Sequence, residues 1–125
     1  MTERVSDAEQ EVLEVLWETA PLSAIEVAQH LSHKKPCQES TVKNLLTRLV
    51  SKGAVLFDKD GRRYLYRPKY PRADYVKAES KRLIDRLFDG RVSPLVAHLA
   101  ENAELSEDDI ASLSRILEEL KDNDA

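Results

Sequence analysis

The 125-residue sequence has one cysteine, three glycines and no long apolar run. The single cysteine, Cys37, excludes an internal disulfide framework and is typical of a reducing compartment. No apolar run approaches the roughly 18 residues that a membrane-spanning helix needs. The N-terminal MTERVSDAEQ lacks the basic-then-apolar order of a signal peptide. We therefore expect a cytoplasmic protein that is not inserted into a membrane.

The sequence also lacks the patterns of catalytic and metal sites. No nucleophile–base–acid arrangement, paired-carboxylate site or phosphate-cradling glycine loop stands out. His30, His33 and Cys37 are three potential metal ligands in a polar turn without a fourth, and a polar surface position explains them better. The acidic residues 107–109 suit the positive end of a helix dipole. We expect no enzyme, no metal site and no cofactor.

The charges that are present are unevenly distributed. Residues 1–33 hold one base against seven acids, a net charge of −6, and residues 70–125 hold eight against thirteen, a net of −5. Residues 34–69 hold ten bases against three acids, a net of +7. The overall charge of −4 would argue against a nucleic-acid partner, but this central basic block favours one.

Residues 40–52, STVKNLLTRLVSK, lie inside the basic block and have the period of an amphipathic helix. Their apolar side chains cluster on one side at 100° per residue, while hydroxyls, one amide and basic groups fall opposite. This outer side has no carboxylate, which favours a helix that meets a polyanion. From the segment alone, a solvated amphipathic helix is an equally good interpretation.

Two helices and a hairpin are predicted around this stretch. Capping boxes of the Ser-x-x-Glu type predict helices over about 7–18 and 23–31. After Gly53, a left-handed C-cap, the period changes to two, which predicts strands over 54–57 and 63–67. Asp-Gly supplies a turn in the connecting loop of five residues. Three helices followed by a hairpin with a basic loop describe a winged helix-turn-helix.

Three more helices are predicted after Pro71, and they carry apolar stripes. They look thin for an independent core, so we expect a helical dimerisation domain over 71–125, after a winged-helix domain over 1–70. The fold class is therefore mainly α with a small β-hairpin. Packing of these helices on the winged helix of the same chain is the competing arrangement. The expected dimer interface consists of Val76, Leu83, Leu87, Leu95, Leu99, Ile110, Leu113, Leu117 and Leu120.

Candidate DNA contacts fall into two chemical groups. Short neutral side chains on the outer face of the 40–52 helix suit base edges, with a capping or solvent-facing position as the alternative for each. They are Ser40, Thr41, Asn44 and Thr47. Basic side chains on this helix and on the hairpin suit phosphates. They are Lys43, Arg48, Lys52, Lys59, Arg62 and Arg63.

Four segments, in order and over nearly the whole chain, carry recognisable motifs. They are SDAEQEVLEVLWE at residues 6–18, STVKNLLTRLVSKGA at 40–54, GRRYLYRP at 61–68 and SPLVAHLAENAELSEDDIASLSRILEEL at 93–120. The T-x-x-x-L-x-x-R-L core of the second segment and the ELS-x-x-x-I tail, with the tryptophan of the first, are more specific than a generic helix-turn-helix. Together the segments resemble the penicillinase-repressor (BlaI/MecI) family.

The resemblance implies a dimeric repressor on a palindromic DNA operator, with half-sites of the A·T-containing TACA/TGTA type, that controls genes such as those for β-lactamase. In the best-known members a membrane zinc-metalloprotease sensor triggers cleavage at an Asn-Phe step, and the weakened dimer leaves the DNA. The aligned step here is His98-Leu99, the candidate cleavage site, which departs from that pattern. Copper-responsive members carry a C-terminal cysteine cluster, which this sequence lacks.

A function of another class is left open by the residues themselves. The same helix and basic wing would suit a protein-interaction module that binds an acidic partner protein. The small polar side chains on the outer face of the helix favour base reading instead.

Overall fold

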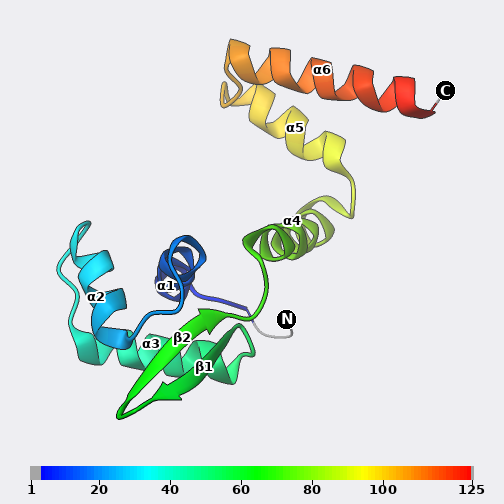
Figure 1. Cartoon of the computed structure of the whole chain (residues 1–125). Coiled ribbons are helices and arrows are strands. Elements are labelled where there is room, and N and C mark those ends of the chain that lie inside the picture. The colour runs from blue at the N-terminus through cyan, green and yellow to red at the C-terminus, as the bar shows by residue number, and fades with distance from the viewer. Residues whose placement is uncertain (1–3, 125) are drawn as a thin grey trace. The chain divides into compact units, whose positions relative to one another are not determined.

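The computed structural model describes residues 4–124, which form six helices and one two-stranded antiparallel hairpin (Figure 1). The mainly helical fold with a small hairpin is the predicted fold class. The chain divides into two compact units that meet within helix α4, between Val76 and Lys77. Tyr70, after which the sequence predicts a domain boundary, lies in the first unit.

Helices α1 (Asp7–Glu18) and α2 (Ala24–Ser32) begin at the two predicted capping boxes. The Ser6 hydroxyl accepts a hydrogen bond from the Glu9 backbone N–H, and the Glu9 carboxylate accepts one from the Ser6 backbone N–H. Ser23 and Glu26 repeat this arrangement at the start of α2. Each box satisfies two backbone donors that a helix N-terminus would otherwise leave unpaired, so both helix starts are confirmed.

Helix α3 (Glu39–Ser51) is the predicted amphipathic helix, and it begins one residue earlier than expected. Val42, Leu46 and Leu49 are fully buried on its inner side. Lys52 is the C-cap, and Gly53 follows in the left-handed region at φ 77°, as the sequence predicts. Glycine suits this position because it adopts positive φ without a Cβ clash.

The hairpin is longer and its turn tighter than predicted. Strand β1 (Val55–Asp60) pairs with β2 (Arg63–Pro68) in a register that sets Asp60 opposite Arg63. The expected five-residue loop is therefore wrong, because only Gly61 and Arg62 connect the strands. Gly61 has φ 66° at the first of the two turn positions, where a type II′ turn requires glycine. On its other edge β2 exchanges two backbone hydrogen bonds with Leu22.

The core of the first unit lies between α1, α2, α3 and the base of the hairpin (Figure 1). The side chains with the least exposure there are Val12, Leu13, Leu16, Val27, Val42, Leu46, Leu49 and Val55. The first turn of α4 (Arg72–Phe88) joins this unit. The Trp17 indole N–H donates to the Tyr70 carbonyl over 2.9 Å, and its ring centroid lies 5.3 Å from that of Tyr75.

The second unit holds the rest of α4, with α5 (Val92–Glu101) and α6 (Glu107–Asp124). A third capping box begins α6: Ser106 and Asp109 exchange hydrogen bonds of 3.0 and 3.1 Å. None of the residues 76–123 is buried. Within the part of the chain that the structure describes, no helix is long and apolar enough to cross a bilayer.

Candidate nucleic-acid interface

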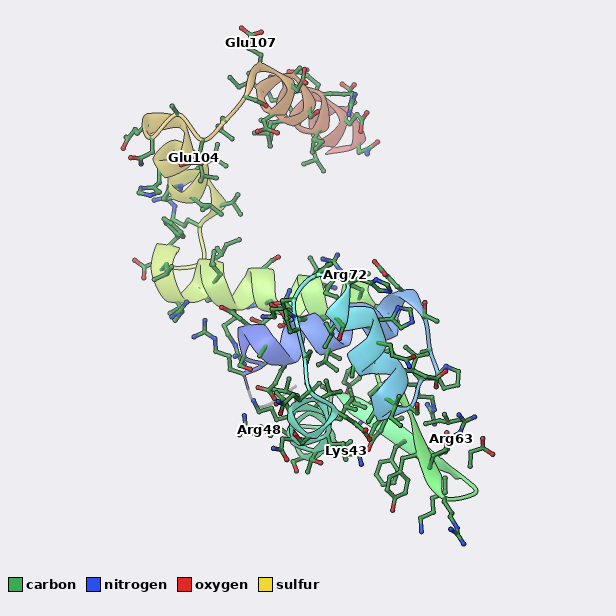
Figure 2. All side chains as sticks on the ribbon, turned by 90° about the vertical axis from the view of Figure 1, so that its left-hand side faces the viewer. Lys43, Arg48, Arg63, Arg72, Glu104 and Glu107 are labelled. Atoms are coloured by element: carbon green, nitrogen blue, oxygen red, sulfur yellow. The ribbon has the colours of Figure 1, made fainter. Side chains whose placement is uncertain are left out.

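The outer face of α3 exposes every residue predicted to read bases. Ser40, Thr41, Asn44 and Thr47 are all solvent-exposed, whereas the apolar side of the same helix is buried in the core. The Thr47 hydroxyl donates to the Lys43 carbonyl over 2.8 Å, which restricts its side-chain rotamer. Figure 2 shows Lys43 and Arg48 projecting from α3. The helix thus presents a surface of small polar and basic groups.

One carboxylate belongs to this helix, contrary to expectation. Because α3 begins at Glu39, that carboxylate lies in its first turn and binds the exposed Lys43 ammonium over 3.1 Å, four residues on. The outer face is therefore not free of acids at its N-terminal end. Pairs of this exposed kind contribute only about 0.3–0.5 kcal/mol, so phosphate can compete for Lys43.

Lys52 is partly buried and forms an ion pair with another residue of the protein. Its ammonium donates to the Glu9 carboxylate over 2.7 Å and to the Arg4 carbonyl over 2.8 Å. The Glu9 side chain is 2% exposed and that of Lys52 is 19% exposed. Burial raises the pKa of Glu9, but hydrogen bonds from Lys52 and Ser6 and the Lys52 charge outweigh it and hold that pKa below its usual value. This pair joins the end of α3 to the start of α1.

The basic residues of the wing lie on two faces of the hairpin. Arg63 binds Asp60 over 3.2 Å, and Arg67 on the same face binds Asp58 over 3.3 Å. Lys59 is on the opposite face, 5.7 Å from the Tyr64 ring centroid. Arg62 is exposed in the turn itself. The structure therefore does not bring Lys59 and Arg63 together, although they are close in sequence.

Two exposed aromatic residues beside Lys59 were not predicted from the sequence. Phe57 is 45% exposed and Tyr64 is 42% exposed. Their ring centroids are 5.0 Å apart in an edge-to-face arrangement. The period of two along each strand was the available signal, because it places residues 57 and 59, and 64 and 66, on a common face.

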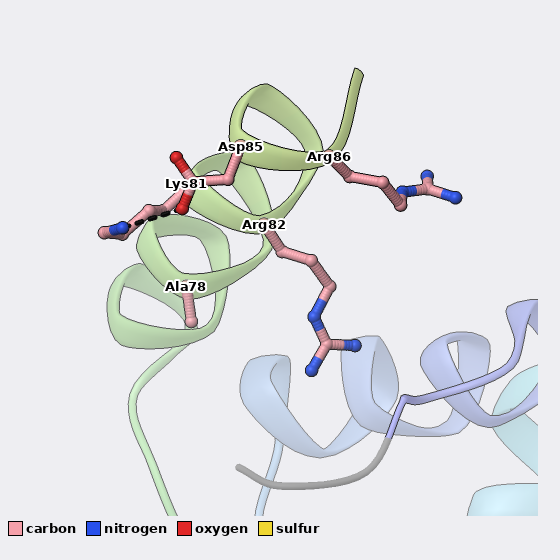
Figure 3. A pocket seen from close by; sticks show the side chains of 5 residues that line it. All are labelled: Ala78, Lys81, Arg82, Asp85 and Arg86. Atoms are coloured by element: carbon pink, nitrogen blue, oxygen red, sulfur yellow. Dashed lines mark hydrogen bonds and ion pairs between the residues drawn. The ribbon is translucent and has the colours of Figure 1, made fainter. Parts of the chain in front are cut away.

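The remaining predicted groups form no second site. His30 and His33 are exposed and Cys37 is half-buried, and no cluster of three potential metal ligands occurs among the residues described. Figure 3 shows a shallow hollow on α4 that Ala78, Lys81, Arg82, Asp85 and Arg86 line. Lys81 and Asp85 bind each other there over 2.7 Å, one helical turn apart. This is a solvated, ion-paired helix surface.

A helix-turn-helix with a polar, basic third helix and an adjoining hairpin defines a winged-helix DNA-binding protein. The sequence model of the penicillinase repressor family matches residues 5–119. The chain therefore belongs to the penicillinase repressor family, whose members are transcriptional repressors and not enzymes.

Characterised relatives agree over almost the whole chain. It is 35% identical over 118 residues to the penicillinase repressor of Bacillus licheniformis, which covers 94% of this chain and 92% of the relative. It is 30% identical over 116 residues to the methicillin resistance regulatory protein MecI of Staphylococcus aureus strain N315, covering 93% and 94%.

Solved structures match the winged-helix part. The DNA-binding domain of the repressor BlaI has a TM-score of 0.53 at 35% identity, covering 60% of this chain and 94% of that one. The monomeric form of Bacillus licheniformis BlaI, solved with the blaP half-operator, has a TM-score of 0.51 at 35% identity and covers 60% and 92%.

Proposed function

We propose that the protein is a dimeric repressor that binds a palindromic operator, with α3 in the major groove and the wing along the flanking backbone. The exposed row of short polar side chains on α3 carries this proposal. These side chains reach base edges without the bulk or negative charge that would keep the helix out of the groove. Asn44 suits adenine, and the methyl groups of Thr41 and Thr47 suit thymine.

The phosphate contacts come from four of the six predicted cations. Lys43 and Arg48 flank the outer face of α3, and Lys59 and Arg62 belong to the wing. All four side chains are exposed, so phosphate oxygens can reach them without disturbing the core. We leave out Lys52, which is held by Glu9, and Arg63, which is on the other face of the hairpin from Lys59.

Dimerisation is proposed to occur through the helices of the second unit. Leu87, Ile110, Leu117 and Leu120 are each more than half exposed, and Leu83 is 39% exposed. Val76, the last residue of the first unit, is 42% exposed on the same helix, α4. Leu95, Leu99 and Leu113 are half-buried. So large an apolar surface is costly in water, and a second copy would cover it. Two linked winged helices then bind two half-sites with a high effective concentration.

The target genes are proposed to be those for β-lactamase or for other cell-wall and antibiotic responses, because the named relatives control penicillinase and methicillin resistance. The protein would act in the cytoplasm. A membrane zinc-metalloprotease sensor would relieve repression by triggering cleavage at His98-Leu99. This bond lies within α5, so a protease must first unwind that helix. Mass spectrometry of chains isolated from induced cells tests this route; intact chains after full induction would exclude it.

A mobility-shift assay with the DNA upstream of its own gene tests the proposed function. We expect a shifted band at moderate salt that survives an excess of random-sequence competitor DNA. A chain that shows no sequence preference would not be an operator-binding repressor. Binding to an acidic protein without any binding to DNA would favour the protein-interaction module.

A further inference from the structure

The two faces of the wing differ in their charges. On one face Asp58 binds Arg67 and Asp60 binds Arg63, so acidic and basic groups neutralise each other. The cross-strand pairs Phe57–Tyr66 and Lys59–Tyr64 lie on the other face, with Val55–Pro68 at its base. Lys59 is the only charged residue of the two strands on that face, and it is basic. We call it the aromatic face, defined by Phe57, Lys59, Tyr64 and Tyr66.

The exposed side chains of the aromatic face are held in position by packing against one another. The Phe57 ring packs edge-to-face on Tyr64, with centroids 5.0 Å apart, and lies 6.1 Å from the ring of the buried Tyr66. The Lys59 ammonium lies over the Tyr64 ring at 5.7 Å. Tyr66 thus anchors a small aromatic cluster whose outer members, Phe57 and Tyr64, remain almost half exposed. Little side-chain entropy would be lost when this surface binds a partner.

The aromatic face also lies on the side of the hairpin nearer to α3. Burial raises the pKa of Tyr66, and the positive charge of Lys43 on α3 is close enough to act against that rise. Arg63 is close to α2 instead: hydrogen bonds from Ser23, and to a lesser degree the charge of Arg63, hold the pKa of Glu26 below its usual value. In Figure 2, Arg63 lies on the side of the hairpin away from Lys43.

Resting on the proposed function, we propose that the aromatic face is the surface of the wing that contacts the DNA backbone. Lys59 neutralises a phosphate, the Tyr64 hydroxyl donates a hydrogen bond to a phosphate oxygen, and the Phe57 ring packs on a deoxyribose. The charge favours this occupant: Lys59 is the one charged side chain on the aromatic face and it is basic, whereas the opposite face pairs each of its bases with a carboxylate. Arg63, on the opposite face, stays paired with Asp60 across the turn and does not contact the DNA.

Paired variants on the two faces test this assignment in the full chain. Affinity is measured by fluorescence anisotropy with a labelled duplex from upstream of its own gene, and with a random-sequence duplex, over a range of salt concentrations. Lys59→Ala should weaken binding and flatten the dependence of log affinity on log salt by about 0.9. Tyr64→Phe should weaken binding roughly tenfold with an unchanged salt slope, because a neutral donor to a charged phosphate is lost. Phe57→Ala should also weaken binding without altering the slope.

Matched controls come from the opposite face. Arg63→Ala and Leu56→Ala, a cation and an exposed apolar residue, should leave both affinity and salt slope close to wild type. The inference is overturned if Arg63→Ala flattens the slope and Lys59→Ala does not, or if Phe57→Ala and Tyr64→Phe bind DNA normally. A change in oligomeric state alone would assign the aromatic face to a second copy and equally overturn it. Wild-type protein that binds neither duplex would instead refute the proposed function.

Thermal melting separates contact from folding. Tyr64→Phe keeps the ring, and Phe57 is too exposed for its loss to unfold the core. We expect both variants to melt within a few degrees of wild type while their affinities fall. Loss of affinity that follows loss of folded protein at the assay temperature would count against a direct contact.

Discussion

Glu9 and Lys52 connect the two helices that position the interface. Glu9 begins α1 as part of its capping box, and Lys52 ends α3. One carboxylate oxygen, Oε1, accepts from both the Ser6 backbone N–H and the Lys52 ammonium, while Oε2 is buried with no partner among the residues described. Because a buried charge is costly without its partner, this pair should hold α3 in one orientation relative to α1.

We predict that Glu9→Gln lowers the free energy of unfolding by about 2 kcal/mol at neutral pH, since it leaves the Lys52 ammonium without its anion. The folded-state pKa of Glu9 lies below its ordinary value of 4.5. The stabilisation is therefore fully present above pH 4.5 and is lost as the pH falls through the lower folded value. Urea denaturation of wild type and variant at several pH values measures this difference, which should vanish in acid.

Glu26→Gln is the matched control, because Glu26 forms the same kind of capping box at α2 but has no ion pair with a partly buried lysine. At neutral pH, Glu26→Gln should lower the free energy of unfolding much less than Glu9→Gln does. Lys52→Gln should weaken DNA binding through the fold, leaving the salt slope as in wild type. A salt slope shallower by about 0.9 would instead mean that Lys52 contacts a phosphate, as predicted from the sequence.

Arg48 and Asn44, both on α3, are predicted to contact different parts of the DNA: Arg48 a phosphate and Asn44 a base. Arg48→Ala should weaken binding to every sequence and flatten the salt slope by about 0.9, because it removes a phosphate contact. Asn44→Ala should reduce the discrimination between bases at one operator position by roughly 1–3 kcal/mol of binding free energy and leave the discrimination at other positions unchanged. Binding to a set of single-base operator variants distinguishes these effects; an Arg48 effect confined to one base would mean that Arg48 reads it.

At the scale of elements, the C-terminal end of α5 is strained. Ala103 has φ 57°, in the left-handed region where a Cβ costs roughly 1 kcal/mol. We predict that Ala103→Gly stabilises the protein by about that amount. Ala97→Gly, at an exposed position inside α5, should destabilise it by about 1 kcal/mol. Denaturation followed by circular dichroism at fixed protein concentration checks both, and loss of stability in Ala103→Gly would contradict the strain.

The helix starts could be predicted from sequence because a capping box is a local interaction. Its two partners are three residues apart, so Ser6 with Glu9 and Ser106 with Asp109 are visible in the chain itself. The hairpin turn was misjudged because the polar run at residues 58–60 is typical of a loop. Its place in the strand depends on cross-strand partners such as Arg67, nine residues from Asp58.

The candidate site shows the same limit. The exposed face of α3 follows from helical period, so Asn44 and Thr47 could be placed on it without a structure. The partner of Lys52 is 43 residues away, and no local pattern indicates that this lysine is paired in the interior. The separation of Lys59 from Arg63 depends on strand register, which the misjudged turn had hidden. The predicted DNA contacts and dimer residues themselves stay predictions.

For the whole molecule, we predict that a chain ending at Val76 is monomeric and binds operator DNA roughly a hundredfold more weakly. It keeps the contact between Trp17 and Tyr75 and hence the complete first unit. In the full chain, Leu117→Asp should have the same effect, because Leu117 is 57% exposed on the apolar stripe of α6. Ala111→Asp, on the opposite side of α6, is the control. Sedimentation equilibrium measures the masses; a dimer of the shortened chain would place the interface elsewhere.

Hydroxyl-radical footprinting of the full chain on the DNA upstream of its own gene tests whether the protein binds a palindromic operator as a dimer. We expect two protected half-sites related by two-fold symmetry, with centres about 34 Å apart or a multiple of it, because two winged helices meet the same face of the duplex. A single unsymmetric footprint at saturating protein, or uniform protection without a preferred site, would contradict a dimeric operator-binding repressor.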